Sequence, residues 1–290
     1  MGLRVVKVCV VKRKIKYMKK NNMLITEIKK IIQEELGISD EVTKISKEFY
    51  SEMITALRNS NDIEKTETTV IKKTPLTFHI GDIKLSCNII YRNFLSKDYD
   101  VLYKMPYVTN GESFRVSKNL YFLFINVLAI SGTINKEKAM ETIQHEIEHV
   151  YQQIKMGNGF GSESMYVKLK NDMESADENR VKVSKLIYYT IKSEQEAFAN
   201  GLYAYFMDLN EPYSEEKLKE SETWNNYVFI KDEINELEHN NEMKSVFNEY
   251  FCEFGLTIKD VKREMGNFLH RIGKVIIKIQ NDKIKQGYRF

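Results

Sequence analysis

The sequence contains few cysteines, and they lie far apart. Cys9, Cys87 and Cys252 are the three cysteines among 290 residues, and no two of them form a C-x-x-C motif. An odd, scattered set of this kind does not indicate a disulfide framework or a cysteine-rich zinc module. We therefore expect reduced thiols, which are typical of a reducing compartment.

Proline and long apolar stretches are also scarce. Only three prolines occur, so the composition favours helices over rigid, proline-rich linkers. The apolar segment 5–11 is interrupted by Lys7 and lacks the order of features of a signal peptide. No segment approaches the roughly 20 apolar residues that span a bilayer. The prediction is a cytoplasmic protein without membrane contact, and a virion-associated protein is the alternative.

An excess of one charge is missing as well. The net charge is +3, whereas nucleic-acid-binding domains are usually strongly basic. Two basic segments, 12–20 and 274–289, are expected to be a solvated tail and a solvated helix face. We therefore do not expect nucleic acid as a partner.

The chain divides into three regions by hydrophobic pattern. Residues 26–57 have helical periodicity, with Val42, Ile45, Phe49, Met53 and Leu57 on one face of a helix that Ser39-Asp40 can cap. Residues 68–130 contain short β-like runs at 68–71, 76–80, 84–90 and 120–128. Pro75 and Gly81-Asp82 separate the first three runs, and Asn110-Gly111 predicts a turn. We expect the last run to be buried on both faces.

After Gly132 the pattern is helical to the end. The predicted helices cover 135–156, 164–175, 179–191, 193–208, 224–239, 241–253 and 257–280. A small sheet followed by a helical region predicts an α+β fold.

The motif with chemical content is His145-Glu146-Ile147-Glu148-His149 in the helix 135–156. His145 and His149 are four residues apart and project from the same helix face, so two imidazoles can bind one metal ion. Glu146 points to the edge of the same site and can accept a proton from a zinc-bound water. A solvent-facing helix with incidental histidines is the alternative interpretation.

A catalytic zinc usually has three protein ligands, so one more is needed. No histidine follows between His149 and His239, which leaves a carboxylate from a later helix. Glu196 is our prediction, because the small residues Ala197, Ala199 and Gly201 would let its helix approach the metal helix closely. The rival ligands are Glu163, Glu174 and Glu194.

The His-Glu-x-x-His motif, followed by Glu196-Ala-Phe-Ala on a later helix, resembles the gluzincin branch of the zincin-like metallopeptidases over residues 117–207. The resemblance implies a zincin-like fold, a Zn²⁺ cofactor and a helical glutamate as third ligand. It also implies that a polar side chain one turn later, here Asn200, orients a ligand histidine. The separation between His149 and Glu196 is longer than in the best-known members.

The predicted function is a zinc metallopeptidase that cleaves a protein or peptide substrate with water activated by Glu146. Tyr203, two turns after Glu196, is the predicted oxyanion stabiliser, and a core tyrosine is its alternative role. The alternative function is a zincin-like structural or binding module in a larger assembly, such as a phage particle.

These predictions divide the chain into a flexible basic arm (1–22), a catalytic domain (23–210) and a helical C-terminal region (211–290). Within the catalytic domain we expect helices at 23–60, the sheet at 68–130 and the metal helices at 135–207. An apolar stripe in the last helix comprises Val261, Met265, Phe268, Leu269, Ile272 and Ile276. It predicts bundle core or a surface for a partner protein, and a nucleic-acid contact is the less favoured alternative.

Overall fold

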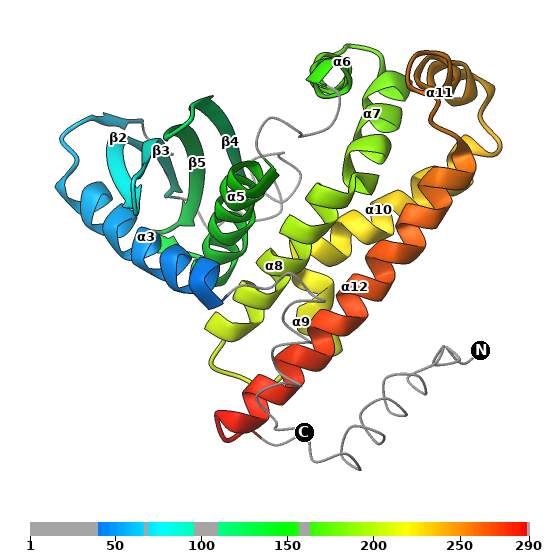
Figure 1. Cartoon of the computed structure of the whole chain (residues 1–290). Helices are drawn as coiled ribbons and strands as arrows, with labels where there is room; N and C mark the ends of the chain where they lie inside the picture. The colour runs from blue at the N-terminus through cyan, green and yellow to red at the C-terminus, as the bar shows by residue number, and fades with distance from the viewer. Residues whose placement is uncertain (1–39, 67–68, 96–109, 157–162, 289–290) are drawn as a thin grey trace. The chain divides into compact units, whose positions relative to one another are not determined.

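The computed structural model describes residues 40–66, 69–95, 110–156 and 163–288 (Figure 1). These residues belong to one compact unit. The predicted basic arm at 1–22 and the predicted helix around 26–36 lie outside the described residues. Within the described part of the chain, no helix is long and apolar enough to cross a membrane.

A mixed sheet of six strands forms the N-terminal half of this unit. Its strands are β1 (Ile63–Lys65), β2 (Thr69–Ile80), β3 (Ile83–Phe94), β4 (Asn110–Ser117), β5 (Leu120–Ile130) and β6 (Thr133–Ile134). The strand order is β1-β2-β3-β5-β4, with β6 paired to β5. β3 and β5 run parallel, and the other neighbours are antiparallel. With the helical C-terminal part, this sheet confirms the α+β class.

Two predicted interruptions of the strands are wrong. Pro75 lies inside β2, opposite Asn88 of β3. The strand tolerates proline there because β1 pairs only as far as Lys72, so β2 is locally an edge strand. Asn110-Gly111 begins β4 instead of forming a turn. The expected turn at Gly81-Asp82 is confirmed, with Gly81 at φ 57°.

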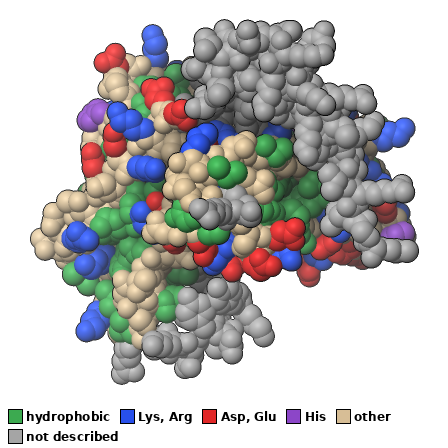
Figure 2. All heavy atoms as spheres, turned by 90° about the horizontal axis from the view of Figure 1, so that it is seen from below, with side chains coloured by type: hydrophobic (Ala, Val, Ile, Leu, Met, Phe, Trp, Pro, Cys, Tyr) green, Lys and Arg blue, Asp and Glu red, His purple; other side chains and the backbone are tan. Residues whose placement is uncertain are grey.

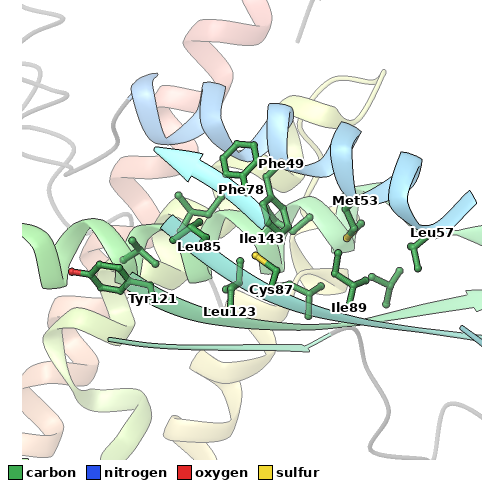
Figure 3. Close-up of a cluster of buried hydrophobic side chains, with 14 of the residues drawn as sticks. Phe49, Met53, Leu57, Phe78, Leu85, Cys87, Ile89, Tyr121, Leu123 and Ile143 are labelled. Carbon is green, nitrogen blue, oxygen red and sulfur yellow. The ribbon is translucent and has the colours of Figure 1, made fainter. Parts of the chain in front are cut away.

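The hydrophobic core lies between the sheet and two helices, α3 (Asp40–Asn59) and α5 (Lys136–Met156) (Figure 3). Phe49 of α3 meets Phe78 of β2 edge to face, with ring centroids 5.4 Å apart. Along β5, buried and half-buried residues alternate, so the strand faces the core on one side only. The expectation that β5 is buried on both faces is therefore wrong, because α3 and α5 cover a single face of the sheet.

Helices make up the rest of the described chain. They are α6 (Glu163–Met173), α7 (Glu178–Thr190), α8 (Lys192–Asp208), α9 (Glu215–Glu220), α10 (Glu222–Leu237), α11 (Asn241–Phe254) and α12 (Ile258–Lys285). α8 packs against α5 on one side and against α12 on the other. α8 therefore connects the sheet-bearing half to the C-terminal helices, and residues after 210 belong to the same compact unit.

The apolar stripe of α12 is largely core. Val261, Phe268 and Ile272 are buried, whereas Leu269 is 43% exposed.

The remaining surface carries both signs of charge. On the face drawn in Figure 2, Lys and Arg side chains lie among Asp and Glu side chains, as the small net charge leads one to expect.

Candidate metal centre

α5 presents the His-Glu-x-x-His motif to the interior. The helix begins after Asn135, whose side-chain oxygen accepts a hydrogen bond from the backbone N–H of Lys138 at 2.9 Å, a bond typical of an N-cap. His145 and His149 are 8% and 6% exposed, and Glu146 is 5% exposed. The motif is therefore enclosed by packed elements, and a solvent-facing helix with incidental histidines is excluded.

α8 supplies the carboxylate that meets the two histidines. Its first turn contains Glu194, which is only 2% exposed. The two helices lie close together at Gly201, where an added Cβ would come within 2.8 Å of the carbonyl oxygen of Glu141 on α5. This confirms the expectation that a small residue here permits the close approach of α8 to the metal helix.

Three donor atoms converge between α5 and α8. Nε2 of His149 lies 3.0 Å from Nε2 of His145 and 3.1 Å from Oε2 of Glu194. Nε2 of His145 lies 3.6 Å from the same carboxylate oxygen. Among the described residues, this is the one group of three or more His, Cys, Asp or Glu side chains close enough to hold a metal ion together.

The structure brings Glu194, one of the rivals, to the two histidines and places the predicted third ligand, Glu196, elsewhere. Two residues along a helix rotate a side chain by about 200°, so these two carboxylates leave α8 on nearly opposite faces. Glu196 faces α12, where its Oε1 lies 3.1 Å from the guanidinium of Arg271. Lys192, one turn earlier on α8, lies 3.8 Å from the same oxygen.

Two rivals remain, and the structure describes the side chain of one of them. Glu174 follows the end of α6 and is exposed. Glu163 begins α6, and its side chain lies outside the described residues.

Tyr203 lies at a different place from the one predicted for an oxyanion stabiliser. It stands nine residues after Glu194 on α8, which is about 13 Å further along the helix axis. Its hydroxyl donates to Asp282 at 3.0 Å and accepts from Nζ of Lys278 at 3.1 Å. Tyr203 therefore joins α8 to α12, and the structure does not bring its hydroxyl to the three converging donor atoms.

The predicted orienting residue, Asn200, is replaced by Gln152. The side-chain amide of Asn200 donates to the carbonyl oxygen of Glu196 in its own helix at 3.1 Å. Nδ1 of His149 instead bonds Oε1 of Gln152 at 3.0 Å. Gln152 is three residues after His149, a spacing that places both side chains on one helix face. The sequence therefore contained this signal, but a glutamine on an exposed helix face gives the same pattern.

Aromatic side chains also line the centre, and no pattern in the sequence indicated them. Phe198 of α8 packs on His145, with ring centroids 4.3 Å apart. Tyr188 of α7 is next to Glu194, and burial together with that carboxylate raises the pKa of Tyr188 well above its ordinary value. The tyrosine is therefore a neutral hydroxyl donor beside the metal-binding group.

The centre attracts positive charge. Burial alone would lower the pKa of His149, but the Glu194 carboxylate outweighs it and raises this pKa to about 9. Burial would likewise raise the pKa of Glu194, yet His149 and His145 hold it well below its usual range. A cation between these groups, whether a proton or a metal ion, is thus favoured by the surrounding charges.

Glu146 lies on the other side of the motif, against β4. An added Cβ at Gly111 would come within 2.5 Å of Cγ of Glu146, so glycine leaves the space that the carboxylate occupies. Burial raises the pKa of Glu146, and the two histidines oppose this shift. A carboxylate with a raised pKa is a better proton acceptor near neutral pH than an ordinary surface glutamate.

The donor set fits a zinc ion. Tetrahedral coordination with Zn–N distances of about 2.0–2.1 Å separates neighbouring donor atoms by about 3.3 Å. The three separations of 3.0, 3.1 and 3.6 Å lie on both sides of that value. Two imidazoles and one carboxylate are also a ligand set that catalytic zinc sites use with a fourth, open position.

Comparison of the chain with protein-family models, with curated proteins and with solved structures finds no match. The functional conclusion therefore depends on the chemistry of the centre itself.

Proposed function

We propose that this protein is a zinc-dependent hydrolase of the zincin-like type, and more specifically a peptidase. The observation that carries the proposal is the convergence of His145, His149 and Glu194, with Glu146 beside them. A zinc site that only stabilises the fold has no need of a fourth, proton-accepting carboxylate next to its ligands.

The chain's own residues supply the proton transfers of amide hydrolysis. When bound by the two histidines and Glu194, zinc supplies Lewis-acid chemistry, acidifying a water molecule and polarising a carbonyl group. Glu146 accepts the proton of the attacking water and delivers it to the amine nitrogen as the C–N bond breaks. Tyr188 is the candidate donor to the developing oxyanion, because its neutral hydroxyl lies beside Glu194.

A peptide substrate is favoured by the position of β4. This strand is the last in the sheet order among the described strands, so one of its backbone edges faces away from β5. β4 also contacts α5, and its Gly111 lies against Glu146. An extended peptide that pairs with such an edge would place its own amide groups beside the proton acceptor.

The test is the isosteric substitution Glu146→Gln. We expect it to retain one zinc per chain and to lose hydrolysis of an unfolded protein or of a fluorogenic peptide library, because the amide cannot accept the proton. Glu137→Gln, in the half-buried first turn of the same helix, is the matched control and should keep full activity. Full activity in Glu146→Gln would contradict the mechanism.

A structural or binding module is the second candidate, and the low exposure of the ligands favours it. His145, His149 and Glu194 are each less than a tenth exposed, as in zinc sites that hold a fold together. On this alternative, wild type and Glu146→Gln would both be inert, while removal of zinc would unfold both.

A further inference from the structure

One glutamine connects the two helices that contribute the zinc ligands. Gln152 of α5 is 5% exposed and uses both ends of its amide. Its Oε1 accepts from Nδ1 of His149 at 3.0 Å, and its Nε2 donates to the backbone carbonyl of Ser193 at 3.1 Å. Ser193 directly precedes Glu194 in the first turn of α8. A single side chain thus contacts one ligand histidine and the backbone next to the ligand carboxylate.

The polarity of the amide fixes the protonation state that the histidine presents. Only an amide oriented with oxygen toward His149 and nitrogen toward Ser193 satisfies both hydrogen bonds. His149 then carries a proton on Nδ1, and its Nε2 is the atom that faces Glu194 and His145. An Nε2 lone pair in this position is what coordination of zinc requires.

The bond to Ser193 extends the connection to a third helix. The hydroxyl of Ser193 lies 3.1 Å from that of Tyr166 on α6. The start of α8 is therefore held from α5 by Gln152 and from α6 by Tyr166. Because Glu194 is the next residue, its carboxylate has little freedom to leave the histidines.

The other ligand histidine is held differently. Among the described residues, Nδ1 of His145 has no hydrogen-bond partner, and its ring packs on Phe198. Of the two histidines, His149 is therefore the one whose ring is oriented by a hydrogen bond on Nδ1.

We infer that Gln152 is a positioning residue that sets His149 and Glu194 for metal binding before the metal arrives. This inference rests on the zinc site of the proposed function. It assigns to Gln152 a part of the zinc affinity, in addition to any part in folding. Loss of a partner that orients a ligand typically costs about 10- to 100-fold in metal affinity.

The experiment measures zinc affinity by competition with a chromophoric chelator for the full chain and three variants. Gln152→Leu removes both hydrogen bonds at similar volume and should weaken binding by about 10- to 100-fold. Gln152→Asn keeps the amide and its charge but shortens the side chain, so it cannot bond His149 and Ser193 together, and its affinity should lie between wild type and Gln152→Leu. Gln153→Leu, at the neighbouring glutamine, should bind like wild type. The melting temperature of each metal-free variant reports whether it has folded.

The outcomes separate the inference from the function on which it rests. A folded Gln152→Leu with wild-type zinc affinity would overturn the inference and leave the zinc site standing. Wild-type affinity in a folded Gln152→Asn would overturn the role of the bridge between His149 and Ser193. If Gln152→Leu does not fold, the intermediate affinity expected of Gln152→Asn still decides the matter. Wild type without measurable zinc affinity would overturn both proposals.

Discussion

Two buried polar clusters lie on the same helix, α8, and they are built on opposite principles. Near its start, Glu194 meets His145 and His149, and three potential lone-pair donors face one another within 3.6 Å. Toward its end, Tyr203 meets Lys278 and Asp282 of α12. The first cluster concentrates acceptors, whereas the second matches a cation, a hydroxyl and an anion.

The second cluster is complete without any added group. Nζ of Lys278 donates to Asp282 at 2.7 Å and to Tyr203 at 3.1 Å, and it also lies 4.3 Å from the centroid of the Tyr203 ring. Such a cluster stabilises helix packing. The first cluster reaches the same electrostatic balance only with a proton or a metal ion. Convergent hydrogen-bond acceptors therefore indicate a binding site for a cation, whereas matched charges indicate a structural contact between helices.

The largest effect should come from removing a proposed zinc ligand from the first cluster. His149→Ala removes one of three ligands, so we expect no zinc after dialysis and no rise of the melting temperature on zinc addition. Metal analysis and thermal melts check this. A full zinc complement in this variant would contradict the assignment of a metal site to the first cluster.

The next largest effect concerns the close contact between Glu146 and Gly111 of β4. In Gly111→Ala, the new methyl group would collide with Cγ of Glu146 and displace the carboxylate. General acid–base catalysis contributes about 10²- to 10⁴-fold, so we expect kcat to fall by about 100-fold. Zinc content should remain at one per chain. Unchanged kcat would show that the function of Glu146 does not depend on its contact with Gly111.

The second cluster should respond in stability alone. Lys278→Met removes the cation that Asp282 and Tyr203 share and leaves Asp282 paired with Lys285 alone. We expect a loss of about 2 kcal/mol in the free energy of unfolding. Denaturant titration of the zinc-loaded variant measures this loss, while its zinc stoichiometry should stay that of wild type. A variant that lost zinc at full stability would reverse the assignment of the two clusters.

The smallest expected effect is a pH dependence at α10. Burial and the neighbouring Glu141 raise the pKa of Glu222 to about 8, with Glu146 adding to the shift and Lys138 opposing it. Glu141 remains bonded to the start of α10 through the backbone N–H groups of Glu222 and Thr223. The folded state therefore keeps a proton that the unfolded state releases above its ordinary pKa of about 4.3.

This difference in pKa between the folded and unfolded states determines how stability changes with pH. Stability falls as pH rises from about 4.3 to about 8, because only the unfolded state gains from losing the proton. Glu222→Gln should melt like wild type at pH 4 and a few degrees higher at pH 8. An equal difference between the two proteins at both pH values would contradict the raised pKa.

Local pattern was sufficient for most elements of the fold. The face of α3 from Val42 to Leu57 and the N-cap of α5 at Asn135 were readable because they depend on neighbours three or four residues away. Pro75 was misinterpreted because its tolerance depends on how far β1 extends, which is a property of the sheet. Asn110-Gly111 begins a strand because its pairing with β5 outweighs a local turn preference.

The candidate site likewise combines residues that the local pattern predicted with residues that only the packing of the helices reveals. His145, Glu146 and His149 lie on one helix, so their spacing alone predicted their common face. The choice between Glu194 and Glu196 required the rotation of α8 about its axis, which packing against both α5 and α12 determines. Small residues after Glu196 indicated a close helix contact, but not which of two alternating glutamates faces it. Tyr188 and Gln152 become recognisable only after that rotation is known.

The central claim is that Glu194, with the two histidines, forms a zinc site. Its most direct test is the zinc stoichiometry and affinity of Glu194→Gln beside Glu196→Gln, two matched changes two residues apart on α8. We predict that Glu194→Gln loses the metal and that Glu196→Gln retains one zinc per chain with wild-type affinity. Retention of zinc in Glu194→Gln, or its loss in Glu196→Gln alone, would contradict the account.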